Sequence, residues 1–412
     1  MRVAVLGAGG FGRTVVLELA ADPRVSEIVV LDRRGDRSKT LASVGRGSSV
    51  TALQGDVTDP TDLRRILRGC DVAVNATLPE YNLPIMQACF DVACGYVDSS
   101  GCSPTTPGET WGVLDQLAMD EAWRARGLTA LPSMGSDPGI SNIMARVAAD
   151  RFVSIDAIRI RWAASGRKGV EGFPLYSREM FLRDALSRPV VWDGTGLVER
   201  DIATGEEEYD FLPPIGRRRV HLFRHEEVLT LPMRLGKPVG YVDYKHAIDV
   251  DLVRSITELA ALNLLAPDRR VRIGQGSVSF RDAFLSAWPE PSTLIGPMEG
   301  VLTIVVEVGG RKADGTDDLV RVSTIVEHKE ANRRRGTTAE YFLTAAAASI
   351  GAILVGLRKT PRPGVLVAEE IPPDVVLPEL RQKGIEFQIK EGVAIPPGGE
   401  TLTLAPSSPG TG

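Results

Sequence analysis

The sequence predicts an α/β protein with an N-terminal Rossmann domain, built on a doubly wound parallel sheet, and a second α/β domain built on a mixed or antiparallel sheet. Two observations predict the first domain: a glycine-rich turn follows an apolar strand near the first residue, and short strands then alternate with helical segments. A third predicts the second domain, because beyond residue 132 the strands become longer and alternate between apolar and polar residues.

The first domain is expected to span residues 1–132. Short apolar strands alternate there with helices and short loops, the order that produces a parallel sheet with helices on its faces. The expected strands are 3–6, 27–31, 50–53, 71–75, 96–98 and 129–132, and the expected helices include 13–21, 83–94 and 114–127.

The second domain is expected to span residues 133–335 and to supply the substrate side of a cleft. In the expected strand 157–163, apolar side chains alternate with arginines such as Arg161, which predicts one buried and one solvated face. Further strands are expected at 241–250, 302–308 and 319–327, and the last two flank a turn-rich segment that indicates a hairpin.

Residues 336–395 are expected to form a C-terminal segment that returns to the Rossmann domain, followed by a loose tail at 396–412 that is rich in proline, glycine and serine. The longest apolar run, 344–357, is too short for a bilayer core, which needs about 20 residues. We therefore expect a buried helix over 337–357.

The glycine turn has the spacing G-x-G-x-x-G between a strand and a helix, which indicates a dinucleotide site. Gly7 allows the tight turn, Gly9 lets a pyrophosphate approach the backbone, and Gly12 lets the helix pack closely on the strand. The first helical N–H groups, near Gly10 and Phe11, would face the phosphates.

The residues at the ends of later strands extend this site. Asp32 follows the second strand, where a carboxylate would accept hydrogen bonds from the adenosine ribose and favour NAD, whereas Arg33 and Arg34 could bind the 2′-phosphate of NADP. We expect NAD, with NADP as the alternative. Asp56 and Val57 are expected at the adenine rim, with a helix-entry role for Asp56 as the alternative, and Asn75, Ala76 and Thr77 near the nicotinamide.

The composition argues against several other classes of protein. The net charge of −5 gives no reason to expect nucleic acid or an anionic membrane as partner. Four cysteines, Cys70, Cys89, Cys94 and Cys102, form no C-x-x-C pair, so we expect reduced thiols and no metal site. No signal peptide is evident, and we expect a cytoplasmic protein.

Longer segments resemble a known family. They are VAVLGAGGFG, DVAVNATLPEYNLPIMQAC followed by YVDSSG, MGSDPGISNIMA, RHEEVLTLP, DYKHAI, GTTAEYFLTAAAASIGAIL and GVLVAEEIPPDVVLPELRQKGIEF. These segments cover nearly the whole chain in family order. By them the chain resembles the saccharopine dehydrogenase-like family, and within it the lysine 6-dehydrogenase branch most.

The resemblance implies hydride transfer between NAD(P) and a carbon–nitrogen bond, and a homodimer. A small-molecule amine would be oxidised to an imine; in the lysine 6-dehydrogenase branch the lysine ε-amine is oxidised and the product semialdehyde cyclises. Asp137 departs from that branch, where the position is apolar, and is more typical of saccharopine reductases. An acidic residue there suits either cationic amine, so the substrate stays open.

Three alternatives remain beside an amino-acid amine dehydrogenase. One is a saccharopine- or opine-type reductase that joins an amine to a carbonyl compound, another is a non-catalytic dinucleotide-binding regulator, and a third is a trans-acting enoyl reductase for lipids. The histidine and lysine candidates below count against the regulator. Polar motif segments and an aromatic content of 6% argue against the lipid enzyme.

Amine oxidation needs a neutral amine and a water that adds to the imine, and a general base near neutral pKa helps both. His225 is the first candidate, because neighbouring Glu226 and Glu227 would raise its pKa. A structural histidine is the alternative. Lys245 is the second candidate, as a carboxylate grip or proton donor, with a solvated strand residue as the alternative.

The remaining candidates are expected to contact the substrate. Asp98 and Asp137 each end a strand of the first domain and should face the cleft, unless they cap turns. Asp137 is assigned with the catalytic residues because it could hold the amine. Tyr244, which could simply be a core residue, and Glu227 are assigned with Asp98 to substrate binding.

Overall fold

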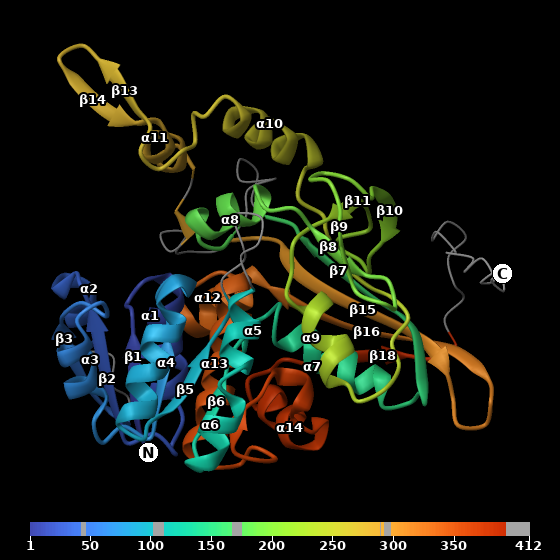
Figure 1. Ribbon diagram of the computed structural model, residues 1–412, viewed down its shortest axis with the longest axis horizontal. Coiled ribbons are helices and arrows are strands. Elements are labelled where there is room, and N and C mark those ends of the chain that lie inside the picture. The colour runs from blue at the N-terminus through green and yellow to red at the C-terminus, as the bar shows by residue number, and fades with distance from the viewer. Residues whose placement is uncertain (43–46, 102–110, 167–174, 289, 292–297, 393–412) are drawn as a thin grey trace, which may run out of the picture.

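The structure is a computed structural model that describes residues 1–42, 47–101, 111–166, 175–288, 290–291 and 298–392. Two sheets organise these residues, the first at the lower left of Figure 1 and the second at the right. The expected tail 396–412 and Cys102 lie outside the described residues.

The described residues form a first sheet of seven parallel strands in the order β17-β6-β5-β4-β1-β2-β3. The first six strands have the 3-2-1-4-5-6 order of a dinucleotide-binding fold, which confirms the predicted Rossmann sheet. The seventh comes from the C-terminal segment. The strands are β1 (Arg2–Leu6), β2 (Glu27–Asp32), β3 (Ser49–Gln54), β4 (Val72–Asn75), β5 (Gly95–Asp98), β6 (Thr129–Leu131) and β17 (Gly364–Val365).

The helices of this part alternate with its strands, as expected. The helix predicted at 83–94 ends at Asp91, because Ala93 has a φ of 59°, a left-handed conformation that commonly ends helices. The helix predicted at 114–127 is divided at Ala118 and Met119 into two. The elements are α1 (Gly10–Ala20), α2 (Gly35–Ala42), α3 (Pro60–Leu67), the 3₁₀ turn η1 (Pro79–Tyr81), α4 (Asn82–Asp91), α5 (Gly112–Leu117) and α6 (Asp120–Ala125).

The second sheet is mixed and has nine strands in the described part of the chain, which confirms the predicted second α/β unit. Its main path is β10-β11-β12-β7-β15-β16-β18, in which β12 is parallel to β7 and the other neighbours are antiparallel; β8 and β9 lie off this path. The strands are β7 (Ser154–Ala164), β8 (Val190–Trp192), β9 (Leu197–Glu199), β10 (Glu207–Asp210), β11 (Arg217–Leu222), β12 (Val242–His246), β15 (Val301–Arg311), β16 (Asp317–Glu327) and β18 (Gln388–Lys390).

The predicted hairpin is the β15–β16 pair, and strand β7 lies against β15. One expectation for β7 is wrong: Arg161 is buried rather than solvated, with 1% of its surface exposed. Its guanidinium forms ion pairs with Asp243 of β12 and Glu207 of β10, so the outer strand β10 covers this face. The pairing supplies the opposite charges that a buried guanidinium requires.

The strand predicted over 241–250 ends at His246. Asp249 ends the extended backbone because its carboxylate accepts a hydrogen bond from the N–H of Asp251 and caps the next helix, α10. The other helices of this part are α7 (Ile140–Ala149), α8 (Arg178–Ala185), α9 (Glu227–Arg234), α10 (Val250–Ala261) and α11 (Phe280–Ser286), and a separate hairpin pairs β13 (Arg270–Ile273) with β14 (Gly276–Ser279).

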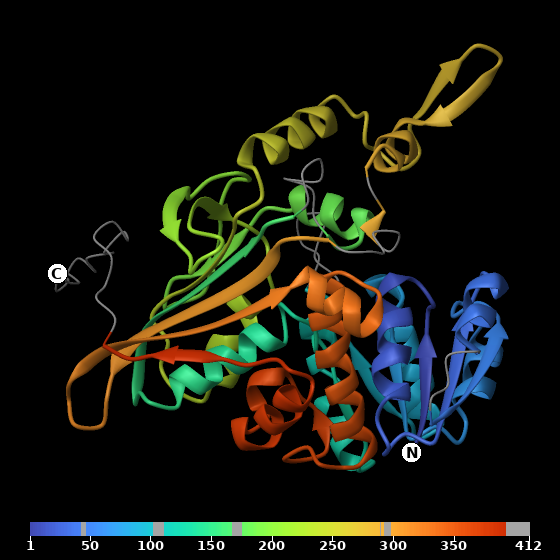
Figure 2. The same ribbon diagram turned by 180° about the vertical axis from the view of Figure 1, so that it is seen from behind.

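The C-terminal segment contributes to both sheets. It consists of α12 (His328–Arg335), α13 (Ala339–Gly356), β17, the turn η3 (Ala368–Glu370), α14 (Pro373–Gln382) and β18. Figure 2 shows it in orange to red, running from beside the first sheet to the edge of the second. A Cβ on Gly95 of β5 would lie 2.5 Å from Val355, which shows how closely α13 lies on the first sheet.

Helix α13 is long and apolar enough to cross a membrane by length and composition, but 89% of it is buried inside the structure. It also contacts α1, β4, β5 and β6. Its apolar surface is therefore the core of the protein, as the sequence predicts.

Candidate functional site

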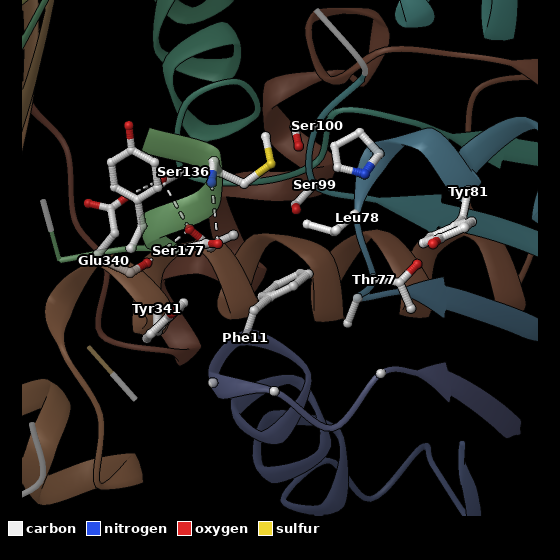
Figure 3. A pocket seen from close by; sticks show the side chains of 18 of the residues that line it. Phe11, Thr77, Leu78, Tyr81, Ser99, Ser100, Ser136, Ser177, Glu340 and Tyr341 are labelled. Carbon is white, nitrogen blue, oxygen red and sulfur yellow. Dashed lines mark hydrogen bonds between the residues drawn. The ribbon is translucent and has the colours of Figure 1, made fainter. Parts of the chain in front are cut away.

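A cavity of about 490 Å³ lies at the carboxyl ends of the first sheet, where loops that follow β1 to β5 meet the second part of the chain. Helix α13 closes one side of it. In Figure 3, Phe11 lies between Glu340 and Tyr341 on one side and Thr77 and Tyr81 on the other. This is the edge where ligands of doubly wound sheets bind.

The glycine turn fits a dinucleotide. Gly7 has a φ of 103°, and a Cβ there would lie 2.6 Å from the carbonyl oxygen of Ala76. A Cβ on Gly12 would lie 2.0 Å from the carbonyl oxygen of Gly7, so Gly12 serves close packing and does not line the cavity. A Cβ on Gly9 would meet no atom within 4 Å, which leaves open space for a pyrophosphate beside the start of α1 at Gly10.

The adenosine end of the cavity carries both of the predicted charges. The carboxylate of Asp32 accepts hydrogen bonds from the N–H groups of Ala8 and Arg34, both at 2.7 Å, which fixes it at the end of β2. Arg33, Arg34 and Arg37 line the cavity beside it. A carboxylate suits ribose hydroxyls and guanidinium groups suit a phosphate, so these residues fit NAD and NADP alike.

Other predicted cofactor residues divide into two groups. Asp56, Val57, Ala76 and Thr77 line the cavity, and Asp56 also accepts hydrogen bonds from the N–H and hydroxyl of Thr58 at 2.9 and 2.8 Å. Asn75 does not line it. Its amide oxygen instead accepts hydrogen bonds from the N–H and hydroxyl of Thr77, so Asn75 positions the turn that does.

Asp98 does not line the cavity, contrary to the expected substrate contact. It is 2% exposed and accepts hydrogen bonds from the N–H of Ser133 at 2.8 Å and the amide of Gln116 at 2.6 Å. Burial raises the pKa of Asp98 to about 6. The side chain at the end of β5 points into the protein, and the following Ser99 and Ser100 line the cavity instead.

The opposite end of the cavity is acidic. The carboxyl groups of Asp137, Asp184, Glu226 and Glu340 all line it, and burial raises the pKa of Glu226 and Glu340 to about 8. The hydroxyl of Ser136 lies 2.6 Å from Asp137 Oδ1 and 3.1 Å from Glu340 Oε1. Oε2 of Glu340 is buried without a hydrogen-bond partner among the described residues. A cationic ligand would stabilise the ionised form of these groups.

His225 lines the same end and is held on two sides. Its Nδ1 lies 3.0 Å from Oε2 of Glu227, and its ring stacks on that of Tyr244 with 3.6 Å between centroids. Although burial opposes its charge, the Glu227 carboxylate raises the pKa of His225 to about 9. The hydroxyl of Tyr244 donates a hydrogen bond to Asp137, and Glu227 accepts a hydrogen bond from Ser141.

The assignment of Tyr244 and Glu227 to substrate binding required both side chains to line the cavity. Neither of them does. Both are buried, with Glu227 and Tyr244 each 0% exposed. They hold His225 and Asp137 in place, which makes them positioning residues.

Lys245 lies away from the cavity. Side chains alternate along β12, so Tyr244 and His246 share one face and Lys245 points to the other. There its ammonium forms an ion pair with Glu207 at 2.9 Å, in the same charged group as Arg161. Its position does not support the predicted catalytic role.

The structure also adds residues that sequence reasoning missed. Glu340 stands at the start of an apolar helix, where a carboxylate is ordinarily explained by the helix dipole. Asp184 lies in a segment without a recognisable motif, and Ser136 and Arg224 are direct neighbours of predicted residues. These four residues come from separate regions of the chain, so only the folded structure shows that they line the same cavity. Within the described ranges, no three His, Cys, Asp or Glu side chains are placed to hold a metal ion.

Comparisons with known proteins concern the family and the fold. Residues 3–131 match the family model described as the saccharopine dehydrogenase NADP-binding domain. This match supports the predicted family resemblance over this domain and an NAD(P) cofactor.

Two relatives align over nearly the whole chain. Carboxyaminopropylagmatine dehydrogenase from Synechocystis is 24% identical over 94% of this chain and 96% of its own length. Carboxynorspermidine synthase from Vibrio cholerae is 24% identical over 95% of this chain and 97% of its own length. Both names describe enzymes, and neither is a lysine 6-dehydrogenase.

Two solved structures share the fold. Saccharopine dehydrogenase from Saccharomyces cerevisiae superposes with a TM-score of 0.70 at 17% identity, covering 95% of this chain and all of that one. Homospermidine synthase from Legionella pneumophila, solved with NAD, gives a TM-score of 0.66 at 15% identity over 99% of this chain and 95% of its own. At these identities the likeness concerns the fold alone.

Proposed function

We propose that the chain is an NAD(P)-dependent oxidoreductase of amines, because residues 3–131 match the NADP-binding domain of saccharopine dehydrogenases. Its reaction is the reductive coupling of a diamine or polyamine with a carbonyl compound, or the reverse oxidation. The names of the full-length relatives support an amine product formed by a dehydrogenase or synthase.

The observation that carries the proposal is the acidic end of the cavity. Asp137 and Glu340 meet at the hydroxyl of Ser136, with Asp184 and Glu226 in the same lining. Several carboxyl groups in one buried cavity repel each other when ionised, and an organic cation removes that repulsion. A substrate with two or more amines can place one ammonium among the carboxyl groups while another amine, in its neutral form, reacts.

The reaction needs one group that donates a proton to the oxygen that leaves the reacting carbon as water. The neutral amine adds to the carbonyl carbon and the adduct loses water to give an imine, which a hydride and a proton then convert to a secondary amine. A bound reduced nicotinamide supplies the hydride. His225 is protonated near neutral pH and its Nδ1 is held by Glu227, so its other nitrogen can give the proton that lets water leave.

Oxidative deamination of an amino-acid amine, as in lysine 6-dehydrogenase, is the second candidate. The same carboxyl groups suit the ammonium of lysine, and His225 could then take up a proton as the amine is oxidised. This reaction needs no carbonyl partner, so the two candidates differ in what must be added to the enzyme.

The test is consumption of NADPH and NADH by the purified protein with diamines, agmatine or lysine, each with and without a panel of aldehydes and 2-oxo acids. Turnover that requires both an amine and a carbonyl compound supports coupling. Reduction of NAD(P)⁺ with lysine alone supports the second candidate. Dinucleotide binding without turnover in either direction would contradict both and favour the regulator.

A substitution of Glu340 tests whether the acidic end of the cavity binds the amine. Glu340→Gln should raise the KM for the diamine about tenfold, the effect of losing roughly 1.4 kcal/mol of binding free energy. Glu330→Gln is the matched control, because that partly exposed carboxylate of α12 pairs with Arg333 and Arg334 and does not line the cavity. Equal KM values in the two variants would contradict the assignment of Glu340.

A further inference from the structure

Two of the four histidines of the chain line the cavity, and His246 is the one to which the proposed reaction gives no role. It is the last residue of β12 and is 3% exposed. Its ring stacks on that of Trp162, its register partner on β7, with 3.8 Å between centroids and planes inclined by 28°. This stacking fixes the plane of the imidazole in the cavity wall.

The hydrogen bonding of His246 also fixes its tautomer. The backbone N–H of Ile248 donates a hydrogen bond to Nδ1 of His246 at 3.0 Å. Because a backbone N–H can only donate, Nδ1 carries no proton, and the proton of the neutral ring is on Nε2. Burial, followed by the nearby His225 and His221, lowers the pKa of His246 well below its ordinary value. The ring is therefore an uncharged hydrogen-bond donor in the cavity lining.

This donor lacks an acceptor among the residues that the structure describes, where the hydrogen bond from Ile248 is the only one of the His246 side chain. His328 shows what is missing. Its Nδ1 likewise accepts a hydrogen bond from a backbone N–H, that of Ala339, and its Nε2 lies 3.0 Å from the carbonyl oxygen of Ser165. Buried donors are ordinarily paired, so an unpaired donor in a cavity wall indicates that an oxygen of a ligand completes it.

From this arrangement we infer that His246 binds the carbonyl oxygen of the compound that is coupled to the amine. This inference rests on the proposed function, which makes the cavity the site of both substrates, and it assigns a residue to the second one. An uncharged donor suits an uncharged oxygen, because it does not supply the positive charge that a buried carboxylate requires. The group bound at His246 is therefore an aldehyde or ketone oxygen.

The position of His246 relative to His225 fits a division of roles. Both rings lie beside Tyr244, whose ring centroid is 3.6 Å from that of His225 and 6.4 Å from that of His246. His246 keeps its proton and orients the carbonyl group, and its hydrogen bond polarises the carbon toward the neutral amine. His225 gives the proton with which the same oxygen leaves as water.

The inference can be tested by binding, without turnover. The probes are 3-methoxypropylamine, 4-methoxybutylamine and 5-methoxypentylamine, each paired with the alkylamine of equal length, which is pentylamine, hexylamine or heptylamine. Within a pair, an ether oxygen, which is an uncharged acceptor, replaces one methylene group. The three pairs place this oxygen at three distances from the ammonium. Calorimetric titration of the NAD⁺- or NADP⁺-loaded protein gives the ratio of affinities within each pair.

Two variants isolate the donor. In His246→Asn the side-chain oxygen can still accept the hydrogen bond of Ile248, but the side chain is too short to place a donor at the position of Nε2. In His246→Gln the longer amide restores a donor there. The ratio of at least one pair should fall about fivefold in His246→Asn and recover in part in His246→Gln. Both variants lose the ring that stacks on Trp162, so lost stacking cannot explain a difference between them.

Two further readouts identify the ligand of His246. Where coupling is observed, the KM for the carbonyl compound should rise about fivefold in His246→Asn, with the KM for the diamine within about twofold of the wild type. The reverse split would overturn the inference. NADH affinity, measured by fluorescence titration, should be unchanged in His246→Asn. A parallel loss of NADH affinity would assign the donor to the nicotinamide amide and would likewise overturn it.

The outcomes separate this inference from the proposed function. Ratios that do not change in His246→Asn, or that fall equally in His246→Gln, would overturn the role of Nε2 even if amines and carbonyl compounds are coupled. A ratio that falls in His246→Asn and recovers in His246→Gln supports an acceptor site at His246 even if the turnover panel is silent, in which case only the proposed reaction fails.

Discussion

The ring of His225 stacks on the ring of Tyr244, with centroids 3.6 Å apart and planes inclined by 10°. The hydroxyl of Tyr244 in turn donates a hydrogen bond to Asp137, so one tyrosine orients both the proposed proton donor and a proposed ammonium ligand. Because Nδ1 of His225 is paired with Glu227, Nε2 is the ring nitrogen that remains available to a substrate.

Tyr244→Phe removes the hydroxyl but keeps the stacking ring. We expect kcat to fall about tenfold and the pH profile of kcat to shift, because Asp137 loses a hydrogen bond beside His225. Steady-state kinetics over a pH series is the measurement. Tyr209→Phe is the control, since its hydroxyl bonds to Glu307 in the second sheet. A pH profile that does not move in Tyr244→Phe would mean that the hydroxyl has a structural role only.

The stability of the ligand-free protein should fall as pH rises. Glu226 and Glu340 have pKa values near 8 in the folded protein, and His225 near 9. Folding therefore favours their protonated forms, so their contribution is full below their ordinary pKa values and is lost as pH rises through the folded ones. A pKa shift of one unit corresponds to about 1.4 kcal/mol. We therefore expect the free energy of unfolding to fall by roughly a few kcal/mol between pH 6 and pH 9.

Urea unfolding at several pH values measures this effect. Glu340→Gln should reduce the fall, because a neutral amide replaces a carboxyl group that must ionise in a buried site. Glu330→Gln should keep the wild-type pH dependence, since Arg333 and Arg334 hold the pKa of Glu330 near 2, outside this range. A stability that rises between pH 6 and pH 9 would refute the prediction.

Two glycines of the same turn should respond differently to alanine. Gly12→Ala should destabilise the fold by several kcal/mol, because its Cβ would lie 2.0 Å from the backbone oxygen of Gly7. Gly9→Ala should fold normally, since its Cβ meets nothing within 4 Å, yet weaken dinucleotide binding about tenfold or more by occupying the space for the pyrophosphate. Thermal unfolding and fluorescence titration with NADH distinguish the two; normal NADH affinity in Gly9→Ala would move the pyrophosphate elsewhere.

We expect the choice between NAD and NADP to depend on Asp32 and on the three arginines beside it. Asp32→Ala should weaken NAD binding about tenfold, since its carboxylate is placed to accept hydrogen bonds from the ribose hydroxyls, and should affect NADP less because Arg33, Arg34 and Arg37 remain. Asp56→Ala, at the same rim, is the comparison. Unchanged NAD affinity in Asp32→Ala would remove Asp32 from the ribose contact and leave it as a cap for Ala8 and Arg34.

The fold and the dinucleotide half of the site could be predicted from the sequence because their signals are local. A glycine turn, an acidic residue twenty positions on, and alternating strands and helices each lie within short windows of the chain. The packing role predicted for Gly12 agrees with the structure, whereas Asn75, expected near the nicotinamide, holds the turn at Thr77 and does not line the cavity.

The acidic half depended on contacts between distant segments. Whether Asp98 or the serines after it face the cavity depends on how β5 meets β6. Whether Lys245 or its neighbour His246 faces the cavity depends on the alternation of side chains along β12. Glu340 and Asp184 carry no local signal of function. Only the folded structure shows that α13 and α8 place these two side chains in the cavity lining.

The return of the C-terminal segment has a consequence for the order of events during synthesis. The ribosome completes β6 long before it releases β17 and α13, which finish the edge and cover of the same sheet. A nascent chain that already contains the whole glycine turn therefore still lacks Glu340 and the helix that seals the cavity. The complete cavity therefore exists only in the finished chain, and a chain that stops short of α13 should expose the face of the first sheet that α13 covers to quality-control proteases.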